Sequence, residues 1–209
     1  MPKEAAFWDK AAQSYDNRVN KTYAKTYEDT IARAKKYLSP GNTLLDYACG
    51  TGITTVQLAG SVKRITAVDI SEGMIGEAKK KTADLGIANV DFSVGNIFGI
   101  EFEGGSFDVV TAFNVLYFIR DPDALLARFR ELLVPSGIFL SATDCIGESP
   151  SFQIKAASFL STLGIFPYMR SFTREKLFSL MTRNGFEILE EKNLFDKTPN
   201  RFIAARKTS

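Results

Sequence analysis

Short apolar runs alternate with longer amphipathic stretches between residues 43 and 144. The runs TLLDY, RITAVDI, VDFSV, FDVVTAF and GIFLSATD are nearly continuous in apolar residues, which is typical of strands buried on both faces of a sheet. Between them, ITTVQLAGS, SEGMIGEAKKKTADLG and DPDALLARFRELLV have helical periodicity. Strands and helices in alternation predict a parallel α/β sheet with right-handed crossovers.

Two of the expected helices begin at residues suited to capping. Ser71 precedes one helix, and Asp121 followed by Pro122 opens another. No internal repeat, low-complexity tract or Pro/Gly/Ser-rich linker interrupts the chain. We therefore expect residues 1–209 to fold as a single domain.

The two flanks of the α/β region have different patterns. Residues 1–40 look helical, with Phe7, Ala11 and Tyr15 on one face, and residues 150–184 form a second, Phe-rich helical stretch. We expect the first flank to be a helical lid and the second to cover the sheet. The last segments, GFEILEEKNL and NRFIAARK, predict a hairpin at the sheet edge.

Composition narrows the possible chemistry. The 209 residues carry a net charge of +2, which is too small to indicate a nucleic-acid partner by itself. The absence of histidine excludes the usual Ser-His-Asp and Cys-His schemes and any His-ligated metal. Two cysteines suit a reducing compartment, and the start MPKEAAFWDK lacks the apolar core of a signal peptide. These features predict a cytoplasmic protein without a metal or a membrane span.

The segment LLDYACGTG follows the first expected strand into a helix. Gly50 and Gly52 stand where the chain must turn sharply and where ligand atoms approach the backbone, although a purely structural turn would use the same glycines. The next strand ends in Asp69, 17 positions after Gly52, where a carboxylate accepts hydrogen bonds from ribose hydroxyls. Loop and acid together predict a ribose-bearing cofactor.

Asp46 indicates which cofactor to expect. Its carboxylate, two residues before Ala48, would repel a pyrophosphate but would hold the ammonium of an amino-acid group, directly or through water. This favours S-adenosylmethionine over NAD, as does the missing Gly-x-Gly-x-x-Gly motif. At the end of the third expected strand, Asn96 offers an amide oxygen to the adenine amino group, and Ile97 is expected to stack on the ring.

Four segments taken in order resemble the class I S-adenosylmethionine-dependent methyltransferases, especially the branch that acts on small molecules. They are LLDYACGTG, AVDIS followed by Met74, VGNIF and FDVVTAFNVLYFIRDPDALLARFRELLVPSGIFL, within about residues 40 to 145. The resemblance implies a Rossmann-like seven-stranded sheet of order 3-2-1-4-5-7-6, with the last strand antiparallel and helices on both faces. It also implies that S-adenosylmethionine lies across the carboxyl ends of strands one to four and leaves as S-adenosylhomocysteine.

The resemblance assigns a cofactor site by position. Its residues are Asp46, Ala48, Gly50 and Gly52 at the methionine end, Asp69 at the ribose, and Ile70, Met74, Asn96 and Ile97 around the adenine, with Phe113 at the end of the fourth strand.

The chain departs from the family pattern at three positions. Ala48 replaces a glycine, so its backbone must keep a negative φ or accept strain. Asn96 replaces a frequent aspartate and accepts a hydrogen bond without charge assistance. Tyr117 stands where a histidine is common, and a tyrosine is a poor base at neutral pH.

Methyl transfer from a sulfonium mainly requires alignment of the reactants and exclusion of water, so a site without histidine is compatible with it. Tyr117 and Asp144 are the candidates for a catalytic or substrate-orienting group. Tyr15, and Arg18 after it, are expected to reach the methionine carboxylate or to close the pocket. Core packing and helix capping would explain the same residues.

A wall for the methyl acceptor is expected from the second helical flank. Phe159, Phe166 and Tyr168 are its predicted residues, and they favour an apolar or aromatic acceptor. A helix that merely covers the sheet would have the same composition.

Three alternatives to small-molecule methylation stay open. Asn114 to Tyr117 has the N-x-x-Y spacing of enzymes that methylate exocyclic amines of nucleic acids, but both prolines of that motif and any basic stripe are missing. A nucleic-acid (RNA) methyltransferase is therefore disfavoured, as is an NAD-dependent oxidoreductase. A S-adenosylmethionine-binding protein without catalytic activity, acting as a regulator, is the third, because the sequence has no evident base.

Overall fold

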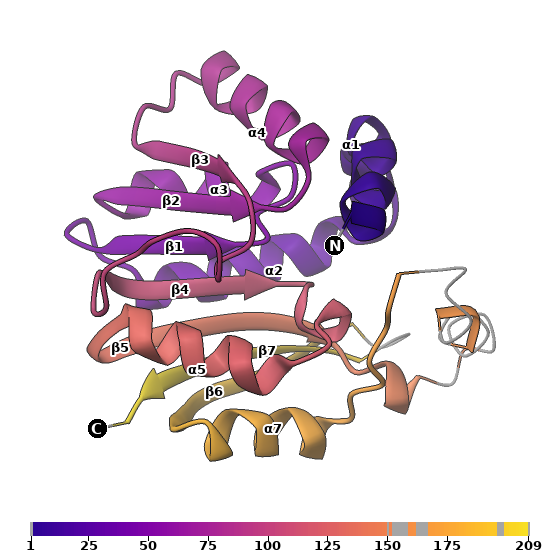
Figure 1. Cartoon of the computed structure of the whole chain (residues 1–209), viewed down its shortest axis with the longest axis vertical. Helices are drawn as coiled ribbons and strands as arrows, with labels where there is room; N and C mark the ends of the chain where they lie inside the picture. Colours follow the sequence, from indigo (N-terminus) through magenta and orange to yellow (C-terminus); the bar gives the residue numbers. More distant parts are fainter. Residues whose placement is uncertain (1, 150, 152–158, 162–166, 196–198, 209) are drawn as a thin grey trace.

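A seven-stranded sheet is the centre of the protein in the computed structural model, which describes residues 2–149, 151, 159–161, 167–195 and 199–208. The strand order is β3-β2-β1-β4-β5-β7-β6 (Figure 1). Only β7 runs antiparallel to its neighbours, whereas β1 to β5 pair in parallel. The predicted order and the antiparallel last strand are confirmed. The strands are β1 (Thr43–Tyr47), β2 (Arg64–Asp69), β3 (Val90–Val94), β4 (Phe107–Phe113), β5 (Leu133–Asp144), β6 (Phe186–Phe195) and β7 (Asn200–Lys207).

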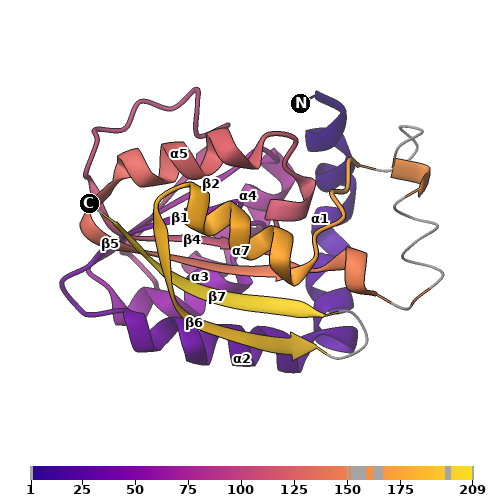
Figure 2. The same cartoon turned by 90° about the horizontal axis from the view of Figure 1, so that it is seen from below.

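Helices cover both faces of the sheet. They are α1 (Pro2–Thr22), α2 (Ala24–Ala34), α3 (Ile53–Leu58), α4 (Glu72–Asp84), α5 (Pro122–Leu132) and α7 (Arg174–Arg183), with 3-10 turns η1 (Lys35–Tyr37), η2 (Ala59–Ser61), η3 (Leu116–Phe118) and η4 (Ile146–Glu148). α5 and α7 lie on one face, and α2 and α3 on the other (Figure 2). α1 stands across the end of the sheet where β1, β2 and β4 finish (Figure 1).

Neighbouring residues of β1 belong to cores on opposite faces. Leu45 packs in an apolar cluster that includes Phe129 of α5 and Leu180 of α7. Leu44 packs in a second cluster that includes Leu58 of α3. All five side chains are fully buried. Because successive side chains of a strand point to opposite faces, the continuous apolar runs mark a sheet that is covered on both sides.

The predicted helix caps form as expected. Ser71 Oγ accepts a hydrogen bond from the Met74 amide at 3.1 Å, and an Asp121 carboxylate oxygen accepts one from the Ala124 amide at 3.0 Å. Pro122 occupies the first turn of α5. These caps fix where α4 and α5 begin, and both beginnings face the same end of the sheet.

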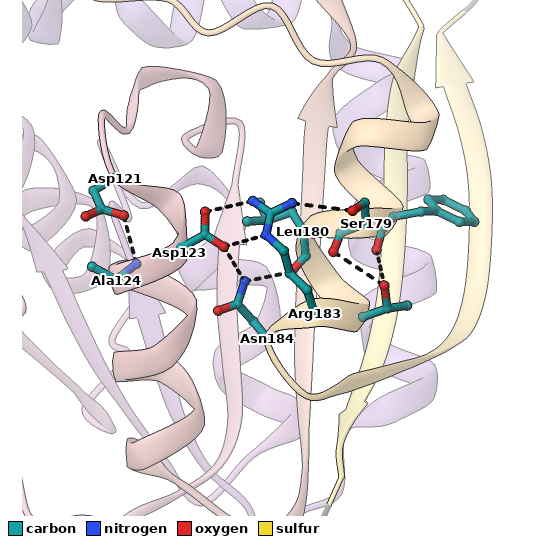
Figure 3. A network of polar contacts seen from close by, with 9 residues as sticks. Asp121, Asp123, Ala124, Ser179, Leu180, Arg183 and Asn184 are labelled. Atoms are coloured by element: carbon teal, nitrogen blue, oxygen red, sulfur yellow. Dashed lines mark hydrogen bonds and ion pairs between the residues drawn. The ribbon is translucent and has the colours of Figure 1, made fainter.

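A polar brace joins α5 to α7 below that end. Asp123 accepts two hydrogen bonds from the Arg183 guanidinium, each at 2.7 Å, and a third from Asn184 Nδ2 at 2.8 Å (Figure 3). Asn184 also donates to the Leu180 carbonyl at 2.9 Å, which closes the end of α7. The bidentate pair orients the two helices, although exposed pairs of this kind stabilise a fold only slightly.

The C-terminal hairpin is present as predicted. β7 inserts beside β5, and β6 forms the sheet edge. Within the predicted helical stretch 150–184, the structure describes a helical turn at 159–161 and α7. No helix in the described ranges is both long and apolar enough to cross a lipid bilayer.

Candidate functional site

A cavity of about 970 Å³ opens where β1, β2 and β4 end. The strand order reverses between β1 and β4, because β1 continues through α3 to β2 on one side while β4 lies on the other. Open α/β sheets bind ligands at such a switch point. The wall draws on the loop after β1, the ends of β2 and β3, the residues after β4, helix α1 and residues 161, 167 and 168.

The loop after β1 contains three residues with left-handed backbone. Ala48, Gly50 and Gly52 have φ angles of 55°, 56° and 75°. Of the two options that the sequence left for Ala48, the structure therefore has the strained one. Gly50 lines the cavity, and a Cβ there would meet nothing within 4 Å, so this glycine leaves room for a ligand. A Cβ on Gly52 would lie 3.1 Å from the Cβ of Ala78, so Gly52 lets the loop pack on α4.

Asp69 lies at the end of β2 with only 8% of its surface exposed. Its Oδ2 accepts a hydrogen bond from the Gly50 amide at 2.9 Å, and its Oδ1 accepts one from the Ser71 amide at 3.0 Å. Burial raises the pKa of Asp69, and these amide bonds oppose the rise. Because a carboxylate has about four acceptor positions, capacity remains for two ribose hydroxyls.

Asp46 lines a second, smaller cavity together with Tyr15, Gly50 and Phe113. Its two oxygens accept hydrogen bonds from Thr55 Oγ1 at 2.6 Å and from Thr111 Oγ1 at 2.8 Å. Burial raises the pKa of Asp46 to about 6, against the effect of both hydroxyls. Each oxygen keeps a free acceptor position, so the carboxylate fits an ammonium group.

The expected adenine region is divided between the cavity and the core. Ile70, Met74 and Asn96 line the cavity. Asn96 Oδ1 accepts a hydrogen bond from the Phe98 amide at 2.9 Å. Ile97 is fully buried in the core, whereas Phe98 lines the cavity with 58% of its surface exposed. Phe98, rather than Ile97, thus offers a ring to stack on an adenine.

Helix α1 forms one wall of the cavity with aromatic side chains. Trp8 packs edge-to-face on Phe118, with ring centroids 5.2 Å apart, and on Tyr15 at 6.3 Å. Trp8, Tyr15 and Phe118 all line the cavity. Arg18 is exposed outside the cavity wall and places its Cζ 5.8 Å from the centre of the Tyr15 ring.

Two aspartates hold α1 to the cofactor side of the cavity. Asp9 Oδ1 accepts hydrogen bonds from Ser71 Oγ at 2.6 Å and from the Gly73 amide at 3.0 Å. Asp16 accepts one from Thr51 Oγ1 at 2.6 Å and pairs with Lys81 Nζ at 2.6 Å. Since Thr51 lies between Gly50 and Gly52, the lid helix is bonded directly to the glycine loop.

The two predicted catalytic residues lie behind the cavity wall. Tyr117 packs against the apolar core, and burial raises its pKa well above the ordinary range, so it is a poor base. Asp144 lies at the end of β5, where its Oδ1 accepts a hydrogen bond from Asn200 Nδ2 at 2.8 Å. Neither is among the described residues that line the cavity. Their catalytic roles stay predictions.

The three residues predicted to contact the methyl acceptor have different outcomes in the structure. Tyr168 lines the cavity, and its ring lies under Arg120, whose Cζ is 4.7 Å from the ring centre. Phe159 is 63% exposed and lies outside the cavity wall. Phe166 lies outside the described residues. Of the three, only Tyr168 lines the cavity, together with aromatic residues of α1 and η3.

Sequence reasoning missed Trp8, Phe118 and Asn114 as wall residues. Trp8 and Tyr15 are seven positions apart, two helical turns, and this spacing would have placed both on one face of α1. The N-x-x-Y spacing drew attention to Asn114 but did not predict it as a wall residue, and its positive φ of 56° appears only in the structure.

Residues 38–185 match the family model described as "Methyltransferase domain". The match extends over more than half of the chain. The chain belongs to this methyltransferase family. The expected resemblance to the class I enzymes is thereby confirmed, and with it S-adenosylmethionine as the cofactor of the family.

Individual relatives are more distant. A demethylmenaquinone methyltransferase of Symbiobacterium thermophilum is 28% identical over 173 residues, or 79% of this chain and 64% of the relative. A ubiquinone biosynthesis O-methyltransferase of Xanthomonas axonopodis is 28% identical over 59% of this chain and 52% of its own length. The chain thus spans about half to two thirds of these two curated relatives.

Two solved structures show the same fold at low sequence identity. A putative methyltransferase in complex with the Trm112 methyltransferase activator of Haloferax volcanii has a TM-score of 0.77 and 17% identity, over 97% of this chain and 98% of that one. The geranyl diphosphate C-methyltransferase of Streptomyces coelicolor has a TM-score of 0.72 and 16% identity, over 93% and 84%.

Proposed function

We propose that the protein transfers a methyl group from S-adenosylmethionine to an apolar small molecule bound in the main cavity. One observation carries the proposal: a single cavity joins Asp69 and the open Gly50 on one side to the aromatic wall of Trp8, Phe118 and Tyr168 on the other. The first side suits an adenosine and the second suits an apolar acceptor. A volume of about 970 Å³ leaves space for both, because ligand cavities typically measure about 300–1,000 Å³.

When bound, S-adenosylmethionine supplies an electrophilic methyl group on a sulfonium. The residues of the chain orient the cofactor, offer acceptors to its polar and charged groups, and exclude water from the cavity. Asp69 offers acceptors to the ribose, and Asp46 offers one to the ammonium. Helix α1, held by Asp9 and Asp16, places Trp8 over the cavity, where its ring keeps water away and favours a cation.

The titratable groups around the cavity restrict the acceptor. Asp121 caps α5 through the Ala124 amide, Asp69 is held by two amides, and Glu4 pairs with Arg120 at 3.7 Å. None of these described carboxylates is free to act as a dedicated base, and the chain has no histidine. We therefore infer that the acceptor atom arrives already nucleophilic, as an amine, a thiolate, an acidic phenol or a stabilised carbanion.

The printed names of the relatives support the apolar character of the proposed acceptor. They concern demethylmenaquinone, an intermediate of ubiquinone biosynthesis and geranyl diphosphate, which are small molecules with apolar parts. For this chain they serve as the first panel of acceptors to test. This panel of acceptors can be tested whatever the oligomeric state of the protein and whether or not it has a protein partner.

Calorimetry with S-adenosylmethionine, S-adenosylhomocysteine and NADH tests the cofactor. We expect micromolar binding of the first two ligands and none of NADH; binding of NADH alone would contradict the proposal. Transfer of labelled methyl groups to quinol precursors, prenyl diphosphates and a metabolite extract then tests the activity.

The same pair of experiments separates the alternatives. Tight binding of S-adenosylmethionine without any labelled product would favour a regulator that binds the cofactor but does not catalyse. Labelled RNA would favour a nucleic-acid methyltransferase, against which the aromatic cavity and the missing basic stripe argue.

A further inference from the structure

A buried chain of hydrogen bonds runs from the hairpin base to the cavity. It starts at Asp144, the last residue of β5, and passes to Asn200, the first residue of β7, which pairs with it in register. Asn200 Nδ2 donates to Asp144 Oδ1 at 2.8 Å and to Asn114 Oδ1 at 2.9 Å. Asn114 is a cavity residue.

Asp144 fixes which way the Asn200 amide faces. An ionised carboxylate only accepts hydrogen bonds, so the nitrogen of Asn200 must point toward it. Asn200 is 3% exposed, and its Oδ1 has no partner among the described residues. The amide keeps this orientation despite the free energy that an unpaired buried oxygen costs, because the reversed amide would bring its oxygen against the Asp144 carboxylate.

The orientation is passed on to Asn114. Its oxygen accepts from Asn200, so its amide nitrogen is the group left to face the Tyr27 hydroxyl, whose pKa the Asn114 side chain lowers. The backbone of Asn114 is also strained, with a φ angle of 56°. The backbone N–H of Asn114 donates a hydrogen bond to the Ala142 carbonyl at 2.7 Å. A strained residue that is fastened at both ends is typical of functional sites.

Tyr27 then determines what Tyr15 presents to a ligand. The two hydroxyl oxygens lie 3.1 Å apart. Either hydroxyl could donate on geometry alone, but the bond lowers the pKa of Tyr15 and raises that of Tyr27, which favours Tyr27 as the donor. The hydrogen of Tyr15 is then left for the cavities, both of which Tyr15 lines.

We propose that Asn200 is a positioning residue that, through Asn114 and Tyr27, holds the Tyr15 hydroxyl as a hydrogen-bond donor for the carboxylate of the cofactor's amino-acid end. This inference rests on the proposed function. The wall of the small cavity, whose volume is about 30 Å³, then has one group for each charge of an α-amino acid. In the proposal Asp46 faces the ammonium, and Tyr15, which lines both cavities, faces the carboxylate at their junction.

The same chain argues against proton transfer from the cavity to Asp144 through these bonds. Two amides, Asn114 and Asn200, separate Asp144 from the tyrosines, and a primary amide does not conduct a proton at neutral pH. In the proposal, Asp144 therefore orients Asn200 and does not act as a base.

Two ligands separate this role from a general effect on folding. S-adenosylhomocysteine carries the amino-acid end, and 5′-methylthioadenosine lacks it. We expect Asn200→Ala to weaken S-adenosylhomocysteine binding by roughly tenfold and methylthioadenosine binding by less than about twofold, as calorimetry and the emission of Trp8, the single tryptophan, will measure. Tyr27→Phe should give the same pattern.

Conservative and control variants complete the test. Asp144→Ala should behave like Asn200→Ala. Asp144→Asn should restore binding only in part, because its amide oxygen still accepts from Asn200 but its nitrogen no longer excludes the reversed Asn200 amide. Ser141→Ala, which removes a buried hydroxyl of β5 without a described partner, should leave both affinities unchanged. Equal losses for the two ligands, or no loss in Asn200→Ala, would overturn the inference, and so would wild-type binding of S-adenosylhomocysteine in Asp144→Ala.

The two proposals fail in different ways. If the wild-type protein binds neither S-adenosylmethionine nor S-adenosylhomocysteine, the proposed function is wrong. If it binds both and Asn200→Ala does not separate the two ligands, only the positioning role is wrong.

Discussion

The two sides of the main cavity are built in different ways. The cofactor side consists of main-chain amides and buried carboxylates from β1, β2 and the turns that follow them, as in the bonds from Gly50 and Ser71 to Asp69. The acceptor side consists of aromatic side chains from α1, η3 and residue 168, as in the contact of Trp8 with Phe118. In the proposed function, the first side binds the cofactor through hydrogen bonds of fixed direction, and the second excludes water and sets the shape of the acceptor site.

Helix α1 connects the two sides. Asp9 and Asp16 bond to the cofactor side, while Trp8 and Tyr15 contribute to the cavity wall. We therefore expect a ligand bound at the glycine loop to affect the position of the aromatic wall through α1. The predictions below separate the two sides, from the largest expected effect to the smallest.

Loss of Asp69 should affect the cofactor side most. Asp69→Ala removes the ribose acceptor and leaves two buried amides unpaired, so we expect S-adenosylmethionine to bind about 3 kcal/mol more weakly, measured by calorimetry. Asp91→Ala on the neighbouring strand removes an exposed pair with Arg64 and should have no effect. An unchanged affinity in Asp69→Ala would place the cofactor elsewhere.

The Asp46 carboxylate should lower the stability of the ligand-free protein at neutral pH and strengthen cofactor binding. Its pKa is raised to about 6, so its contribution to stability is present below its ordinary value of 3.8 and is lost as the pH rises through 6. Asp46→Asn should therefore stabilise the ligand-free protein by about 2 kcal/mol at pH 7.5 and by nothing near pH 4. Urea unfolding at both pH values measures this difference.

The same variant should bind S-adenosylmethionine more weakly, because the ammonium loses its carboxylate partner. A variant that gains no stability at pH 7.5 would mean that the two threonine hydroxyls fully compensate for burial.

Breaking the bonds of Asp16 in α1 should weaken cofactor binding less than replacing Asp69 or Asp46. Asp16→Ala breaks the bonds to Thr51 and Lys81, and we expect about 1 kcal/mol weaker binding of S-adenosylhomocysteine with a shift in Trp8 emission. Asp84→Ala, an exposed change at the end of α4, is the matched control. Wild-type affinity and wild-type Trp8 emission in Asp16→Ala would show that neither cofactor binding nor the position of α1 depends on these bonds.

The smallest effect concerns backbone strain in the glycine loop. Ala48 and Gly50 have nearly equal φ angles of 55° and 56°. Ala48→Gly should stabilise the protein by about 0.5 kcal/mol, and Gly50→Ala should destabilise it by about 1 kcal/mol, because only an L side chain is strained there. Thermal unfolding measures both changes.

Gly60→Ala is the control for this pair, since its Cβ also meets nothing within 4 Å and its φ is not positive. Destabilisation by Gly60→Ala equal to that by Gly50→Ala would show that φ is not the cause.

Local patterns predicted Gly50 and Asp69 as cofactor residues, and the structure brings both to the wall of one cavity. Gly50 and Asp69 lie at the ends of adjacent strands, and parallel strands bring their carboxyl ends together wherever they pair. The order of the strands followed from the family resemblance. Ile97 and Phe98 mark the limit of this reasoning, because sequence placed the ring contact one residue away from the side chain that lines the cavity.

The sequence by itself determined the elements, the caps and the carboxylates of the cofactor side, because those depend on spacing within a few tens of residues. Only the tertiary structure decided that Ala48 adopts a positive φ, that Trp8 lines the cavity, and that Asn200 and Asn114 meet. The physical reason is that these features arise from contacts between segments far apart in the chain, such as the 86 positions between the two asparagines. Such pairings depend on the packing of the whole sheet, and no local periodicity encodes them.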